Sequence, residues 1–152
     1  GASRQRQNLG QARIHGVEAS ADLRLGRHVI AAAAYTLAEA RVTRSPDNPG
    51  LLGNLLAQDP IHRGHLSLAF LHARAELSVQ LRAQSQQFED DANQLPMAGF
   101  AALDAFAAVP LTRGIAAFAS AQNLLNERYL VGRAGVDTIG PPFLLLAGLR
   151  LR

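Results

Sequence analysis

Apolar and polar side chains alternate strictly along several stretches of this sequence. In residues 76–84, Leu77, Val79 and Leu81 alternate with polar or charged neighbours, and residues 17–25 repeat the design. A period of two places successive side chains on opposite faces of a β-strand. Each stretch is about nine residues long, which is the length of a tilted strand that crosses the hydrocarbon layer of a membrane. The pattern therefore predicts amphipathic strands of membrane-spanning length.

Glycine and proline punctuation divides the chain into seven predicted strands. The strands are expected at about residues 8–25, 28–43, 61–71, 74–88, 99–110, 114–124 and 142–152. Their connections alternate between short turns, near 26–27, 71–74 and 110–114, and long polar loops, at about 44–59, 88–98 and 126–141. Tight turns at one end of a meander and long loops at the other are typical of a membrane barrel. The predicted fold class is all-β: an antiparallel up-and-down meander of about seven strands, which forms a sector of a transmembrane β-barrel.

The two faces of these strands carry different chemistry. A charged face is costly in lipid but normal for a barrel interior. The lumen-facing candidates are Glu18, Asp22, Arg24, Glu76, Gln80 and Arg82. The lipid-facing candidates are Leu77, Val79, Leu81, Leu149 and Leu151. Residues 28–43 are rich in alanine on both faces, so their sides stay open. A change of phase at His15-Gly16 predicts a bulge or a glycine kink.

Composition argues against several classes of function. The hydrophobic fraction is 48%, yet the longest apolar run, residues 29–38, is about half the length of a membrane-spanning helix. The chain has no cysteine, and its 15 basic residues, all arginine, are scattered rather than gathered into the basic face that nucleic acid requires. No nucleophile motif or phosphate-binding loop is present. We therefore predict that the protein is not an enzyme, has no cofactor and does not bind nucleic acid.

Two other folds stay open at this point. Residues 31–41 and 116–128 are rich in good helix formers, which would suit a helical interaction domain. The alternation in 76–84 argues against helices, because it would place charges around the whole helix circumference. The second alternative is a small stand-alone β-barrel that binds an apolar ligand inside. It needs an even, closed set of strands and an apolar interior.

Candidate ligand-binding groups are few. His62 and His65 are three residues apart, so on a strand they point to opposite faces, and we interpret them as strand-end histidines rather than metal ligands. The acids at 89–91 have the oxygen ligands that Ca²⁺ prefers, but a solvated loop is the favoured interpretation. Residues 126–129 could contact a ligand, although a turn and a place in an aromatic girdle are favoured. The aromatic candidates for the membrane-interface girdles are Phe70, Phe88, Phe100 and Tyr129.

Several short motifs follow one another along the chain. The run 8–18 reads Asn-Leu-Gly-Gln-Ala-Arg-Ile-His-Gly-Val-Glu, and the run 122–129 reads Gln-Asn-Leu-Leu-Asn-Glu-Arg-Tyr. The other members of the series are Ala-Ala-Tyr-Thr at 33–36, Asp-Pro-Ile-His at 59–62, Leu-Asp at 103–104, Gly-Pro at 140–141 and Gly-Leu-Arg-Leu-Arg at 148–152. This ordered series resembles the barrels of TonB-dependent outer-membrane receptors. The run 8–18 is similar to a strand common in these barrels, and the run 122–129 is close to the family's Asn-Leu-Phe-Asp-x-x-Tyr.

The resemblance implies a fold and a role. It implies a plugged barrel of about 22 strands, of which residues 1–152 would supply the C-terminal part, without the plug domain. It also implies transport of a scarce nutrient, most often a ferric siderophore, across the outer membrane of a Gram-negative bacterium. Outer-membrane lipid is then the expected partner of this segment. A siderophore or similar ligand and TonB are expected as partners only of the full-length receptor.

Overall fold

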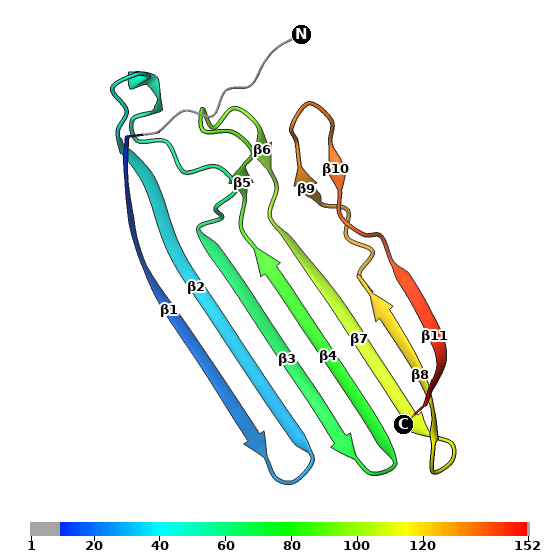
Figure 1. The fold of residues 1–152 in the computed structure, drawn as a ribbon. Helices are drawn as coiled ribbons and strands as arrows, with labels where there is room; N and C mark the ends of the chain where they lie inside the picture. The colour runs from blue at the N-terminus through cyan, green and yellow to red at the C-terminus, as the bar shows by residue number, and fades with distance from the viewer. Residues whose placement is uncertain (1–9, 152) are drawn as a thin grey trace.

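Seven long strands lie side by side in chain order and form one antiparallel sheet (Figure 1). The structure is a computed structural model that describes residues 10–151. The long strands are β1 (Gln11–Leu25), β2 (Val29–Arg44), β3 (His62–His72), β4 (Ala75–Gln84), β7 (Phe100–Pro110), β8 (Ile115–Gln122) and β11 (Leu144–Leu151). Each strand pairs with its neighbour in the order of the sequence. The predicted all-β meander of seven strands is confirmed.

The two ends of the sheet are connected differently. At one end, the short-turn end, tight turns join β1 to β2, β3 to β4 and β7 to β8, and the other end, the loop end, carries the long connections (Figure 1). The loops contain a 3-10 turn, η1 (Pro49–Leu51), and two small hairpins, β5 (Gln87–Phe88) with β6 (Pro96–Met97) and β9 (Leu130–Gly132) with β10 (Thr138–Ile139). The sequence pattern did not predict these hairpins. It placed the end of the fourth long strand at 88, whereas β4 ends at Gln84 and residues 87–88 form β5.

The helical alternative is wrong. Residues 31–41 lie within β2 and residues 116–122 lie within β8, and each of these strands pairs with neighbours on both sides. The helix preference of alanine is a small term per residue, and two ladders of backbone hydrogen bonds outweigh it. In the part of the chain that the structure describes, no helix has the length and apolar character to cross a membrane. The small closed barrel does not fit either, because β1 and β11 are the two edges of the described sheet.

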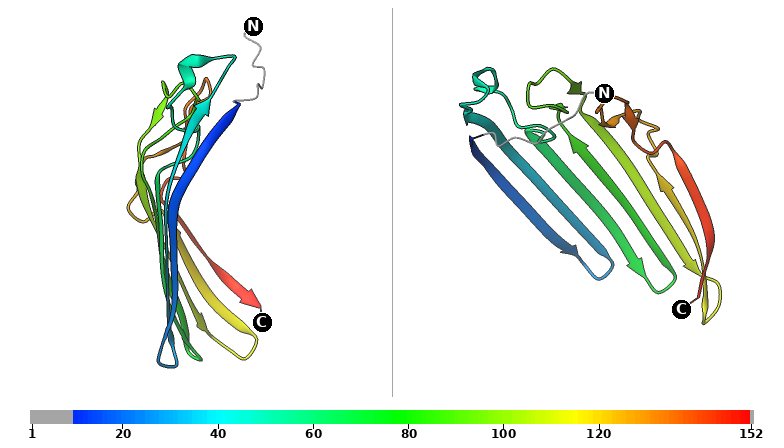
Figure 2. Two further views of the ribbon diagram at one scale, coloured as in Figure 1. Left: turned by 90° about the vertical axis from the view of Figure 1, so that its left-hand side faces the viewer. Right: turned by 45° about the horizontal axis from the view of Figure 1, so that its top comes forward.

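The sheet is curved (Figure 2), and one ion pair identifies its concave face. Arg150 of β11 and Glu76 of β4 are three strand spacings apart, about 14 Å along a flat sheet. Their Nη2 and Oε2 atoms are nevertheless 3.1 Å apart. Side chains this far apart in the sheet meet only on the inside of a curve, so Glu76 and Arg150 lie on the concave face. The opposite side is the convex face.

The structure shows an irregularity in β1, but at a different position from the predicted one. The register shift lies between Gln11 and Ala12, not at His15-Gly16. Gly16 is still special, because a Cβ atom there would meet the carbonyl oxygen of Leu37 and lie 2.8 Å from the Cα atom of Ala38. The β2 backbone thus approaches β1 so closely at this point that only glycine fits without a shift.

Candidate functional site

The convex face is a continuous apolar surface in the middle of the sheet. The β3–β4 register pairs Leu66 with Leu81 and Leu68 with Val79. Alanines of β2 continue both rows on one side, and Leu103 and Ala105 of β7 continue them on the other. Directly paired residues point to the same side of an antiparallel sheet. Leu66 and Leu68 are each 53% exposed, although they lie in the centre of the sheet. Large apolar side chains are therefore left uncovered over a wide area, which marks an interaction surface or a membrane surface.

The concave face is polar along the same strands. One row runs Asp22, Ala32, Ser67, Gln80 and Asp104 across β1, β2, β3, β4 and β7. Small alanines of β2, β7 and β8 lie between the polar groups, and the inward curvature buries several of them. The buried alanines on this face are Ala40, Ala102, Ala108 and Ala116. The concave face is therefore polar along this row, whereas Phe106 of β7 and Phe118 of β8 stack on the same face.

The register places the two predicted sets of residues on opposite sides of the sheet. The residues on the concave face are Glu18, Asp22, Arg24, Glu76, Gln80 and Arg82. The residues on the convex face are Leu77, Val79, Leu81, Leu149 and Leu151. Their separation follows from the period of two. That the first set faces a lumen and the second faces lipid stays a prediction.

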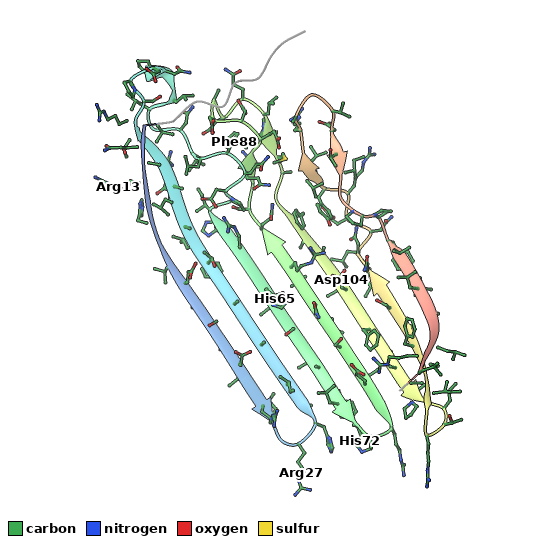
Figure 3. All side chains as sticks on the ribbon, viewed as in Figure 1. Arg13, Arg27, His65, His72, Phe88 and Asp104 are labelled. Atoms are coloured by element: carbon green, nitrogen blue, oxygen red, sulfur yellow. The ribbon has the colours of Figure 1, made fainter. Side chains whose placement is uncertain are left out.

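The polar groups of the concave face are joined to the loop end through Asp104. Its Oδ2 atom lies 3.5 Å from Nη2 of Arg82, and its Oδ1 atom accepts a hydrogen bond from the backbone N–H of Asn123 at 2.9 Å. Figure 3 shows Asp104 and His65 in the body of the sheet, well away from the turns. Sequence reasoning found Arg82 but gave no role to Asp104 or Arg150, because both ion pairs join residues that are distant in the chain.

Asn123 closes the last long loop at its base. It is 2% exposed and has a positive φ of 49°. Its Nδ2 atom donates to the carbonyl oxygens of Glu127 and Pro141, both at 2.9 Å, and its Oδ1 atom accepts from the N–H of Glu127 at 2.9 Å. These bonds hold the start and the end of the loop together. Sequence reasoning recognised this segment as a family-like motif but missed its structural centre.

The first two long loops are held to one another by side-chain amides. Asn93 donates from Nδ2 to the carbonyl oxygen of Leu55 at 2.9 Å and accepts from the N–H of Leu55 at 2.8 Å. Asn54 donates to the carbonyl oxygen of Asp91 at 3.0 Å. The third loop is joined through Arg133, which donates to the carbonyl oxygen of Pro96 at 2.9 Å. The three loops therefore form one connected structure above the strands.

The metal-site alternatives do not gain support. His62 lies on the convex face beside Tyr35, whereas His65 lies on the concave face opposite Arg82, so their rings point away from one another as expected. The carboxylate of Asp90 accepts hydrogen bonds from the N–H groups of Gln94 and Leu95 and shapes a turn. Within residues 10–151, no three histidine or acidic side chains gather in a metal-binding arrangement.

The aromatic girdle prediction needs correction at Phe100 and Tyr129. Tyr129 is 7% exposed and stacks on Phe100 with ring centroids 3.9 Å apart, so these two rings pack against each other instead of facing a membrane interface. A convex-face aromatic at the loop end is Tyr35, whose hydroxyl lies 2.8 Å from Nδ1 of His62. Tyr35 belongs to β2, and the alanines on both faces of this strand left its two sides unassigned in the sequence. The register with β1 and β3 now assigns them.

Comparison with protein families gives one match. Residues 1–124 match the model of the family described as TonB dependent receptor-like, beta-barrel. Comparison with curated protein sequences gives no match.

Solved structures share the fold. The siderophore receptor PiuA from Acinetobacter baumannii superposes with a TM-score of 0.78 at 15% identity, over 91% of this chain and 22% of that one. The unliganded ferric citrate transporter FecA gives 0.76 at 22% identity, over 91% and 24%. The copper transporter OprC gives 0.67 at 19% identity, over 91% and 23%. This chain thus spans less than a quarter of the length of each of these proteins.

Proposed function

Because this chain belongs to the TonB-dependent receptor β-barrel family, we propose that it is a C-terminal sector of an outer-membrane barrel that imports a scarce nutrient. The family is one of transport receptors, in agreement with the prediction that the protein is not an enzyme. The observation that supports this role best is the contrast between the faces. Exposed leucines on the convex face would contact lipid, and the ion-paired concave face would line the lumen.

The proposed orientation places the loop end outside the cell. Tight turns lie on the periplasmic side of outer-membrane barrels and long loops on the extracellular side. The three connected loops would then form part of a vestibule that receives the ligand. The proposed ligand is a ferric siderophore, as the names of several structural neighbours suggest for those proteins, although one neighbour is a copper transporter. Plug, TonB and ligand would act together with this sector only in the full-length receptor.

The test is uptake by cells that carry the full-length receptor. We expect its deletion to reduce accumulation of one radiolabelled ferric siderophore in a panel, and TonB deletion to reduce accumulation equally. Copper and cobalamin serve as the competing ligands in the same assay. TonB-dependent uptake of copper alone would leave the transport role intact and refute the siderophore. No TonB-dependent change for any member of a broad panel would contradict the transport role.

A further inference from the structure

Two histidines from neighbouring hairpins meet at the short-turn end of the sheet. His28 is the last residue of the turn between β1 and β2, and His72 is the last residue of β3. Their ring centroids are 4.9 Å apart, and the ring planes are inclined at 72°. Phe70 packs beside both rings, at 5.9 Å from His28 and 6.2 Å from His72. Figure 3 shows His72 at this end of the sheet. We call His28 and His72 the histidine pair.

Hydrogen bonding leaves one ring nitrogen of His28 available as a ligand. Its Nδ1 atom lies 2.9 Å from the carbonyl oxygen of Leu71. Because a carbonyl oxygen only accepts, Nδ1 carries the proton and Nε2 keeps its lone pair. The N–H group of Leu71 donates to the carbonyl oxygen of His28 at 2.7 Å, which holds His28 beside β3. Metal-bound histidines typically have this arrangement, in which the other ring nitrogen donates to a backbone carbonyl.

His72 is held by a weaker bond that a metal ion can replace. Its Nδ1 atom accepts from the backbone N–H group of Arg74 at 3.2 Å, which is at the long end of the range for hydrogen bonds. Both residues are exposed, so water can satisfy the N–H group once it is released. The histidine pair therefore offers two neutral imidazole nitrogens, one from each hairpin.

The spacing of the two rings matches a single bound ion. A ligating ring nitrogen lies about 2.0 Å from the ion, which places the ring centroid about 3.2 Å from it. Two rings at neighbouring positions of a square-planar or tetrahedral ion then have centroids roughly 4.5–5.2 Å apart. The observed separation of 4.9 Å lies within this range. An open cavity of about 410 Å³, which is lined by His28, Leu71, His72, Ala73 and Glu76, has room for the ion and its water ligands.

We propose that the histidine pair binds one divalent transition-metal ion, with Cu²⁺ held most tightly. Imidazole nitrogen suits Cu²⁺, Ni²⁺ and Zn²⁺, and Cu²⁺ has the highest affinity of this series. Within residues 10–151, no three histidine or acidic side chains form a metal-binding group, so water occupies the remaining coordination positions. The bound ion links the hairpin of β1 and β2 to the hairpin of β3 and β4. Both protein ligands come from these two hairpins, and the site does not depend on the transport role.

The experiment measures Cu²⁺ binding to the full-length receptor in detergent micelles by electron paramagnetic resonance. One equivalent of Cu²⁺ should give a spectrum with splitting from two imidazole nitrogens. Titration against a competing chelator gives the affinity. His28→Gln and His72→Gln should each lower it by at least about tenfold, because loss of even an outer-shell partner costs this much. His65→Gln, on the concave face opposite Arg82, is the matched control and leaves the affinity unchanged.

Two further measurements test the charge and the ligand type of the site. Arg27 and Arg74 are exposed in the two turns beside the histidine pair, and their positive charges oppose binding of a cation. Arg27→Gln and Arg74→Gln should therefore each raise the affinity by about twofold. Mg²⁺ should not compete, because it prefers oxygen ligands. A spectrum with fewer than two nitrogens, equal affinity in the wild type and both histidine variants, or competition by Mg²⁺ overturns the proposal.

The metal site and the transport role fail separately. Normal TonB-dependent uptake by a receptor whose Cu²⁺ binding ignores both histidines leaves the transport role standing and removes the metal site. Histidine-dependent Cu²⁺ binding in a receptor that imports nothing keeps the metal site and removes the transport role. The shift in gel mobility on heating, which reports a folded barrel, is measured for every variant so that loss of affinity is scored only in folded protein.

Discussion

The convex and concave faces of the sheet are built from the same seven strands, yet they differ in which side chains they expose and which they bury. On the convex face, Leu66 and Leu68 are 53% exposed in the centre of the sheet. On the concave face, Ala102 and Ala116 are fully buried at 0% exposure, and charged residues pair across several strands. A sheet in water would hide its leucines and expose its charges. The inversion is explained if lipid surrounds the convex face and a polar lumen lies against the concave face.

A charge on the convex face should break this comparison with the largest effect. Val79→Arg places a guanidinium group in the middle of the apolar rows, and it should lower the free energy of unfolding in a bilayer by about 2–4 kcal/mol. Gln80→Arg is the matched control, because the neighbouring residue points to the concave face opposite Asp104. Urea unfolding of the receptor in lipid vesicles measures both. Equal costs for the two substitutions would refute the assignment of the faces.

Substitution of two glycines tests the contrast between the two faces through the space available to an added side chain. Gly16→Val drives a side chain into the backbone of Leu37 and Ala38, which should cost about 1–3 kcal/mol. Gly64 lies on the convex face, where an added Cβ atom would meet no other atom within 4 Å, so Gly64→Val should be nearly neutral. Unfolding midpoints of the two variants in the same vesicles give the comparison. A tolerated Gly16→Val would show that β1 is free to move away from β2.

The link between the concave face and the loop end should give an intermediate effect. Asp104→Ala removes the acceptor for the N–H group of Asn123 and the partner of Arg82. We expect a loss of about 1–2 kcal/mol, because the N–H group of the buried Asn123 loses a charged partner. Gln80→Ala, in the same row, is the control. Protease cleavage within residues 123–143 should increase for Asp104→Ala only, and unchanged cleavage would show that Asp104 does not hold the loop.

The ion pair across the curve should give the smallest effect on stability. Glu76→Gln weakens the contact with Arg150, but both side chains are more than a third exposed, so the loss should stay below about 1 kcal/mol. High salt should reduce the difference between Glu76→Gln and the wild type. Leu77→Ile, at the next position on the convex face, is the volume-matched control. A loss above about 2 kcal/mol would show that this pair carries more of the curvature than its exposure suggests.

The regular part of the fold could be predicted because the information is local. The alternation around Leu77, Val79 and Leu81 fixes both the strand and its two faces, and glycine or proline marks two of the three short turns, at 26–27 and at 110–114. The apolar stretches of β3 and β11 were placed for the same reason. No partner strand needs to be known for any of these assignments.

The rest depends on contacts between distant residues. The strands of the loop hairpins are only two or three residues long, and the loops that carry them are held by contacts such as Asn93 with Leu55, 38 positions apart. The pair Arg150–Glu76 joins residues 74 positions apart. In the alanine-rich β2, neither face stands out, so the convex position of Tyr35 follows only from the strands on either side. Local sequence patterns do not predict such contacts between distant residues.

The placement of the short turns bears on how barrels of this design change size. Each pair of strands that a tight turn joins starts at the loop end and returns to it. Such a pair is therefore a unit whose removal does not change which face of the remaining strands is apolar. Duplication or deletion of one such unit keeps the direction of every other strand. Insertion of a single strand would send all later loops to the wrong side of the membrane. The circumference of such a wall therefore evolves in steps of two strands, and an ancestral gene can widen or narrow its pore without redesigning what remains.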